Sequence, residues 1–159
     1  VSQRFLIDII KMGDENCNKH NLLYLSLVQL LLYHKDDIDV NIKDWYGYTA
    51  LIWAIRKKKI EICKLLLAHK DIDVNIQDDW YGKTALMYAV QCAKNYEICK
   101  LLLVHKDIDV NIQNKCGYTA LMYAGGVIQC EKNYEICNLL LNHKHMSKYN
   151  ILIFKIRQL

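Results

Sequence analysis

The sequence predicts an all-α fold, a solenoid of stacked helix-turn-helix units with projecting hairpin-like loops. The first observation is recurrence, since DWYGYTALIWAI at 44–55 returns as DWYGKTALMYAV at 79–90 and KCGYTALMYAGG at 115–126. The second is an apolar stripe at helical spacing in each copy. The third is length, because isolated helices shorter than about 12–15 residues are marginal in water. Each copy must therefore bury its stripe against the next one.

A second recurring block marks the other half of each unit. It reads EICKLLLAHKDIDVNI at 61–76, EICKLLLVHKDIDVNI at 97–112 and EICNLLLNHK at 135–144, with a degenerate copy at 26–42. We therefore expect a single domain of 159 residues. Its expected segments are a divergent N-terminal capping repeat (1–43), three repeats (44–78, 79–114 and 115–144) and a divergent C-terminal tail (145–159).

The N-terminal pair of helices is expected over residues 3–12 and 21–34. In the repeat that follows Gly82, the first helix is expected from Thr84, a capping residue, to about Cys92. The second helix is expected from 96 to 104, with its stripe turned to the core. The intervening DIDVNIQDDWYG segment carries turn residues, and Gly82 is expected to adopt a positive φ.

The last repeat and the tail depart from this pattern. Three extra residues, Gly125, Gly126 and Val127, predict that the first helix of the last repeat ends early or bulges, since glycine weakens a helix. The tail after residue 144 carries the apolar run ILIF at 151–154. This run fits a short helix, a strand or the remnant of a further unit.

The pattern D-x-x-G-x-T-x-L-x-x-A, followed by E-I-x-K-L-L-L and D-V-N, resembles the ankyrin repeat. The resemblance is clear over 44–144 and partial over 20–43. Alanine and an apolar residue replace the usual Pro and His after each Thr, so apolar packing must replace the Thr–His hydrogen bonding of the family. Lys58 stands where the family has a Gly, and we expect a turn of another geometry there because a left-handed lysine is costly.

Two recurring residue types could suggest chemistry. His34, His69, His105 and His143 share one repeat position, but stacked units place equivalent atoms about 10 Å apart, too far for one metal ion. Cysteines 63, 99 and 137 recur inside the apolar stripe, where cysteine behaves as a small hydrophobe. No catalytic constellation is found, so we expect a protein that is not an enzyme and needs no metal or cofactor.

Charge and composition exclude other classes. The net charge of +4 is too small to indicate nucleic acid, and RKKK at 56–59 reads as a solvated turn or, as a weaker alternative, a phosphate contact. No apolar run approaches the roughly 18 residues of a membrane helix, and no secretory signal is evident. Seven cysteines without a C-x-x-C pair favour an intracellular, cytoplasmic protein, in a host cytoplasm if it is an effector.

The resemblance implies that the partner is another protein, bound by a monomer through the concave face of the first helices and through the loop tips. Large aromatic side chains are favoured at such interfaces. Some of them could instead pack tip against tip, and Trp53, Tyr88 and Tyr123 could floor the same face or only pack. The predicted partner-binding residues are Trp45, Tyr46, Tyr48, Trp80, Tyr81, Lys83, Lys115 and Tyr118.

A protein–protein interaction module is therefore the predicted function. The alternative is a targeting fragment of a larger enzyme, or of a host-directed effector or degradation adaptor, whose effector part is absent. The start at Val1 and the incomplete last unit keep that alternative open.

Overall fold

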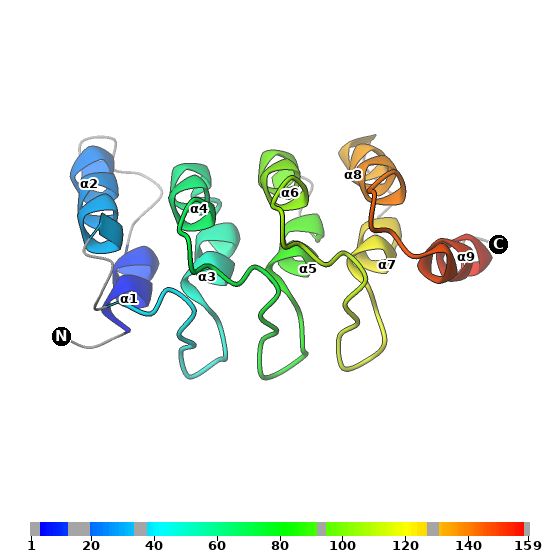
Figure 1. Ribbon diagram of the computed structural model, residues 1–159, viewed down its shortest axis with the longest axis horizontal. Helices are drawn as coiled ribbons and strands as arrows, with labels where there is room; N and C mark the ends of the chain where they lie inside the picture. The colour runs from blue at the N-terminus through cyan, green and yellow to red at the C-terminus, as the bar shows by residue number, and fades with distance from the viewer. Residues whose placement is uncertain (1–3, 13–19, 34–37, 92–94, 127–130, 158–159) are drawn as a thin grey trace.

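The computed structural model describes residues 4–12, 20–33, 38–91, 95–126 and 131–157, and these residues form helices, turns and loops with no strand. The predicted all-α solenoid is confirmed (Figure 1). The predictions made for His34, Cys92 and Val127 fall outside these residues. The helices are α1 (Phe5–Met12), α2 (His20–Tyr33), α3 (Ala50–Arg56), α4 (Ile60–Leu67), α5 (Ala85–Val90), α6 (Tyr96–Leu103), α7 (Ala120–Gly125), α8 (Glu131–Leu141) and α9 (Lys148–Arg157).

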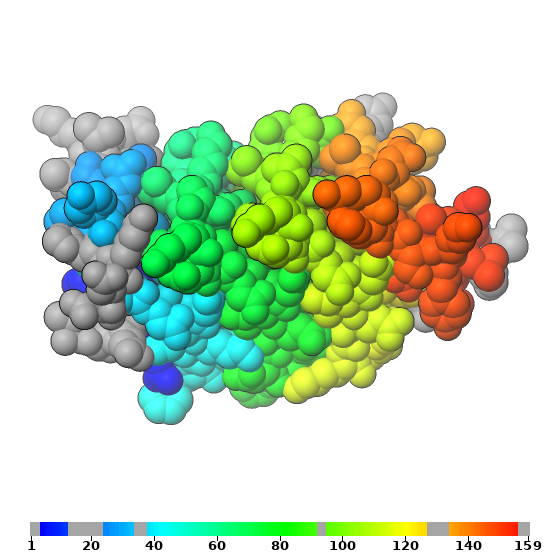
Figure 2. All heavy atoms as spheres, viewed as in Figure 1, coloured from blue at the N-terminus to red at the C-terminus, as the bar shows by residue number. Residues whose placement is uncertain are grey.

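The helices form two layers. The first helices, α1, α3, α5, α7 and α9, each pack on the next, and α2, α4, α6 and α8 do the same in the second layer. Hairpin-like loops project side by side beyond the first layer (Figure 1). In space-filling view the units follow one another as successive bands along an elongated molecule (Figure 2).

A threonine begins each of the three central first helices. The hydroxyl of Thr84 accepts a hydrogen bond from the Met87 amide at 3.4 Å, and the equivalent bonds in α3 and α7 are 3.3 and 3.4 Å long. Such a cap contributes about 1 kcal/mol by satisfying an amide that the helix cannot. Ile52, Met87 and Met122 are buried, so apolar packing does replace the histidine of the usual motif.

The turn between α3 and α4 corrects one expectation. Lys58 has a φ of 55°, so it adopts the left-handed conformation itself. Its amide donates to the Ile55 carbonyl at 3.0 Å, and the Lys59 amide donates to the Ala54 carbonyl at 2.9 Å. These bonds close the end of α3 and offset the roughly 1–2 kcal/mol that a left-handed lysine costs. The expected different geometry was wrong.

The second helices turn their apolar stripe into the core. In α6 the side chains of Ile98, Cys99, Leu102 and Leu103 are all buried, as predicted, and Leu102 is 0% exposed. Equivalent residues of α4 and α8 belong to the same continuous cluster of buried side chains. Because α6 packs on α4, α5 and α8, each unit supplies apolar surface against which its neighbours pack.

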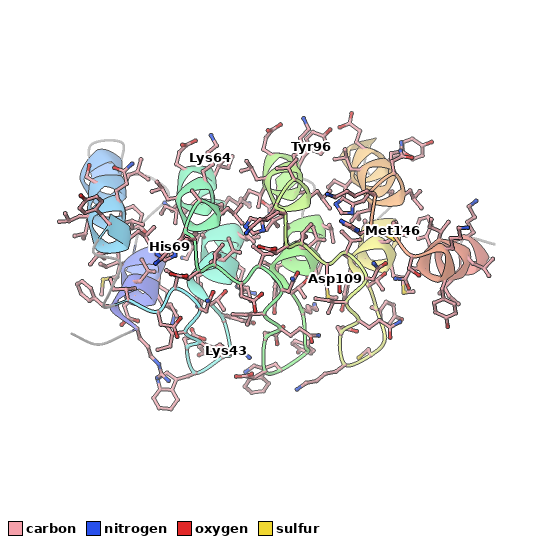
Figure 3. All side chains as sticks on the ribbon, in the orientation of Figure 1. Lys43, Lys64, His69, Tyr96, Asp109 and Met146 are labelled. Atoms are coloured by element: carbon pink, nitrogen blue, oxygen red, sulfur yellow. The ribbon has the colours of Figure 1, made fainter. Side chains whose placement is uncertain are left out.

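One asparagine side chain bridges each junction between units. The Asn41 amide donates to the Asp71 carbonyl at 2.7 Å, and its oxygen accepts the Asp73 amide at 2.8 Å. Asn75 makes the same two bonds to Asp107 and Asp109, at 2.7 and 2.9 Å. The labelled Asp109 lies in the loop that follows α6 (Figure 3).

The aspartates of the same segment close local turns. Asp73 accepts the Asn75 amide at 2.9 Å, and Asp109 accepts the Asn111 amide at 2.8 Å. The prediction that these recurring aspartates serve turn geometry is confirmed.

The C-terminal tail forms α9, which takes the place of a further first helix beside α7. Helix α7 is as long as α5, so it does not end early, and the alternative of a bulge at Val127 lies outside the described residues. The last residue of α7 is Gly125, and the Phe154 ring of α9 occupies the space where a side chain would lie. A Cβ at this position would be 2.0 Å from the ring. A glycine thus permits close docking of the terminal helix.

We expect Gly125→Ala to loosen α9 by displacing Phe154, although alanine is favoured over glycine within α7 by about 1 kcal/mol. Hydrogen exchange should show faster exchange of the α9 amides with little change in α5. Gly126→Ala is the matched control, because its Cβ would find only ordinary contacts with α7 carbonyl oxygens, the nearest at 3.4 Å. Equal effects of both variants on α9 would contradict this role for Gly125.

Candidate functional site

The predicted aromatic residues at the hairpin tips point into solvent. Trp45 is 85% exposed and Trp80 is 63% exposed, and both are large apolar side chains. Tyr46, Tyr81 and Tyr118 are exposed as well. The Arg4 guanidinium lies 4.6 Å from the Trp45 ring centroid.

A buried polar side chain holds each hairpin, which sequence reasoning missed. Asp44 accepts the amides of Tyr46 and Tyr48 at 2.9 and 3.0 Å. Asp78 and Asn114 hold the next two hairpins by equivalent bonds. An Asp or Asn three or four residues before the glycine of each hairpin was the available signal, since Asp and Asn bond to amides two residues on.

The glycine of each hairpin has a left-handed backbone, which was predicted for Gly82. The φ values of Gly47, Gly82 and Gly117 are 74°, 67° and 76°. The hairpin that follows Asp78 contains one residue more than the one that follows Asp44, because its closing bond runs to the Lys83 carbonyl. This repeat therefore holds one extra residue between Asp78 and Lys83.

Lysines and backbone groups, rather than indole rings, tie the tips together. Lys43 forms an ion pair with Asp79 of the next hairpin at 2.8 Å. The Lys115 amide donates to the Tyr81 carbonyl at 3.0 Å, and its ammonium donates to the Asp79 carbonyl. The structure therefore engages Lys115 in linking tips, whereas the side chains of Trp45 and Trp80 remain exposed.

Cations and aromatic rings alternate on the face of the first helices beside the hairpins. The Arg56 guanidinium lies 4.9, 5.5 and 5.6 Å from the ring centroids of Tyr48, Trp53 and Tyr88. The Lys83 ammonium lies 5.5 Å from the Tyr88 centroid and 4.8 Å from that of Tyr123. We call these residues the cation–aromatic stripe: Tyr48, Trp53, Arg56, Lys83, Tyr88 and Tyr123.

Hydrogen bonds to the hairpin anchors fix the rings of the stripe. The Trp53 indole N–H donates to Asp44 Oδ2 at 2.8 Å, and the Tyr88 hydroxyl donates to Asp78 Oδ2 at 3.1 Å. Burial, above all, raises the pKa of Tyr88, and hydrogen bonding to Tyr48 raises it further. The rings are thus set in place before any ligand arrives.

Lys11 ends the stripe on the N-terminal side. Its ammonium forms an ion pair with Asp44 at 2.6 Å and lies 4.8 Å from the Trp53 ring centroid. Burial alone would raise the pKa of Asp44, but hydrogen bonds from Lys11, Trp53 and the Tyr48 and Tyr46 amides hold it below its usual value. The charge of Lys11 is thereby matched within the protein.

Stacked helix pairs, threonine caps and projecting hairpins agree with the comparison to known proteins. The family model described as ankyrin repeats, three copies, matches residues 16–114 and residues 81–153. The chain belongs to the ankyrin repeat family. Ankyrin repeats are in general protein–protein interaction modules, and their fold is in general a non-enzymatic binding scaffold.

Among the solved structures that are similar to this ankyrin domain in fold, one illustrates the agreement. It is the crystal structure of EF0377, an ankyrin repeat protein, with a TM-score of 0.65 and 24% sequence identity. The match covers 89% of this chain and 74% of that chain. A search of curated proteins gives no match.

The recurring histidines of the ankyrin units bond to nearby backbone amides, and the recurring cysteines lie in the core. His69 and His105 each accept, at Nδ1, the backbone amide two residues on, at 3.3 Å. Within the described ranges, no three His, Cys, Asp or Glu residues lie close enough to hold a metal ion. Cys63, Cys99 and Cys137 are buried as predicted, and burial raises the pKa of Cys63 to about 12.

Other features of the surface lie apart from the predicted site. An open hollow of about 310 Å³ lies on the second layer, lined by Tyr96, Glu135, Asn138, Leu139 and Asn142. None of the predicted partner-binding residues lines it. Every helix in the described part of the chain is too short or too polar to span a bilayer.

The basic run at 56–59 is divided by the fold. Arg56 ends α3 and stacks on aromatic rings, whereas Lys57, Lys58 and Lys59 form the turn to α4. Arg56 therefore lies on the last turn of α3 and not in the turn between the helices, although it is exposed to solvent as predicted for the run. The signal lay in its spacing, because residues three apart on a helix, such as Trp53 and Arg56, share a face.

Proposed function

We propose that this ankyrin domain is a protein-binding module that holds one partner against its hairpin tips and the cation–aromatic stripe. The observation that carries the proposal is the exposure of Trp45 and Trp80 at neighbouring tips. Trp, Tyr and Arg are the residue types most often found at the energetic centre of interfaces. The stripe supplies all three types on the adjoining face.

The stripe suits binding because its side chains are already ordered. Tyr48 packs edge-on against both Trp53 and Tyr88, with ring centroids 5.5 and 5.6 Å apart. Side chains held in place before binding lose less conformational entropy on association. In this proposal the predicted concave face and the tips act together, in an intracellular monomer that needs no cofactor.

We expect Trp45→Ala and Trp80→Ala each to weaken partner binding by about 1–2 kcal/mol, because an exposed indole can be buried only by the partner. The melting temperature should change little, since neither indole belongs to the core. The partner would be isolated by affinity pull-down with the intact chain and identified by mass spectrometry. Binding would then be measured by calorimetry and melting by circular dichroism.

Tyr134→Ala serves as the matched control, since Tyr134 is an exposed aromatic residue on α8, in the second layer. It should leave the affinity unchanged. A fall in stability for the two tryptophan variants that equals their loss of binding would show that the tips are structural and would overturn the proposal.

A further inference from the structure

Arg56 and Lys83 are two like charges that share one aromatic ring. Both lie within 5.6 Å of the Tyr88 ring centroid, Arg56 from α3 and Lys83 from the next hairpin. Among the described residues, no carboxylate lies within ion-pair distance of either cation. Their contacts are the aromatic rings and, for Lys83, the Gln91 side-chain oxygen at 3.3 Å.

Several other cations of the described chain have a carboxylate partner. Those with a carboxylate within 4.0 Å include Lys11, Lys43, Lys64, Lys70, Lys100 and Lys106. Most of these pairs are solvent-exposed, where an ion pair contributes little. Arg56 and Lys83 lie on aromatic rings and have no such partner among the described residues.

The electrostatics of the pair are unfavourable in the absence of an anion. Burial lowers the pKa of Lys83, Asp78 opposes that change, and the charge of Arg56 lowers the pKa again. Asp78 cannot serve both cations, because its carboxylate accepts the amides of Trp80 and Lys83 and the Tyr88 hydroxyl. A carboxylate brought by a ligand would relieve the repulsion.

We propose that Arg56 and Lys83 form a subsite for the Asp or Glu side chains of an extended acidic segment of the partner protein. This inference rests on the proposed protein-binding function. A guanidinium whose plane is held by rings keeps its N–H groups available for a two-bond contact with a carboxylate. Lys83 adds a point charge beside the same tyrosine ring.

The spacing suits an extended chain. Side chains at positions i and i+2 of an extended segment point to the same face and lie about 7 Å apart. Because the charged groups of Arg56 and Lys83 both lie within 5.6 Å of the Tyr88 ring centroid, two acidic residues separated by one other residue can reach them together. The aromatic surfaces of Tyr48 and Tyr123 flank the two cations and would contact the neighbouring side chains of the segment.

Charge favours a peptide over nucleic acid. A phosphate backbone carries a charge at every nucleotide and requires a continuous row of cations. Here the carboxylates of Asp44, Asp78 and Asp79 contact Trp53, Tyr88 and Lys43 beside the stripe, so the face offers no continuous row of cations. An acidic segment with spaced carboxylates can place its charges on Arg56 and Lys83 alone.

The test is a selection from a random-peptide display library on the immobilised full chain at about 50 mM salt. We expect enrichment of peptides with Asp or Glu at alternate positions. A synthetic peptide of the enriched sequence should bind about tenfold more weakly to Arg56→Gln and to Lys83→Gln, and about tenfold more weakly when its own Glu residues are Gln. Arg56→Lys should restore part of the affinity, because it keeps the charge without the planar fork.

Lys64→Gln is the control, since Lys64 lies on α4 at the edge away from the hairpin that carries Lys43 (Figure 3). It removes one charge and should leave binding unchanged. Enriched peptides that are not acidic, or that bind Arg56→Gln as well as the natural chain, would overturn the acidic subsite and leave the protein-binding function standing. Absence of any enriched peptide would count against both, and tighter binding of an oligothymidylate probe than of the peptide would assign the cations to phosphate.

Discussion

Leu102→Ala is expected to lower the free energy of unfolding by about 2–5 kcal/mol, because it leaves a cavity where a fully buried side chain stood. Helix α6 packs on α4, α5 and α8, so the cavity weakens the packing between this unit and both of its neighbours. Urea or guanidinium titrations followed by circular dichroism would measure the change.

Val104→Ala is the matched control, since Val104 follows α6 and is exposed to solvent. It should change the free energy of unfolding by less than about 0.5 kcal/mol. A loss of the same small size for Leu102→Ala would show that the apolar face of α6 has been misplaced.

Gly47→Ala is expected to cost about 3 kcal/mol through two separate effects. Its φ of 74° is strained for any residue with a Cβ, which costs about 1–2 kcal/mol. The new Cβ would also lie 2.3 Å from the Asp79 backbone nitrogen, so the neighbouring tip would have to move, at a further cost of about 1–3 kcal/mol. Denaturant titration would measure the sum.

Gly117→Ala separates the two effects. Its φ of 76° imposes the same backbone strain, but a Cβ at Gly117 would find no atom within 4 Å. We therefore expect Gly117→Ala to cost only the strain, about 1–2 kcal/mol. Equal losses for the two variants would mean that contact between the first two hairpin tips contributes nothing to stability.

Features that depend on local spacing could be predicted from the sequence. The apolar stripe of α6, the threonine cap of α5 and the positive φ of Gly82 each follow from a few neighbouring residues. The repeat itself predicted the stacking, because none of these short helices can bury its stripe alone. The family and fold were therefore within reach of the sequence.

Features that join different units could not be predicted in the same way. Arg56 meets Tyr88 across a unit boundary, and Lys11 meets Asp44 across a segment of chain that shows no clear repeat. From the sequence, Gly125 was interpreted only as a residue that weakens a helix. Its contact with Phe154 could not be predicted, because Phe154 is 29 positions away and belongs to a tail without the repeat pattern. Lys58 was misjudged because the cost of its conformation was visible in the sequence and the bonds that offset it were not.

The site was predicted only in outline. The aromatic residues at the hairpin tips could be recognised in the sequence. That Trp80 stays exposed while Lys115 links two tips could not be predicted, because it depends on the positions of Asp79 and Tyr81. Arg56 was hidden within a run of four basic residues, three of which do form a turn.

The asparagine bridges make the interior junctions interchangeable. Asn41 and Asn75 present the same two groups to the same two acceptor and donor positions, in Asp71 with Asp73 and in Asp107 with Asp109. After an in-frame deletion of 71–106, Asn41 could make the same two bonds to Asp107 and Asp109. Whole repeats could therefore be lost or duplicated without a new kind of contact between units. The deletion would remove the ion pair between Lys43 and Asp79 at the hairpin tips, because Lys115 would then lie opposite Lys43 in place of Asp79.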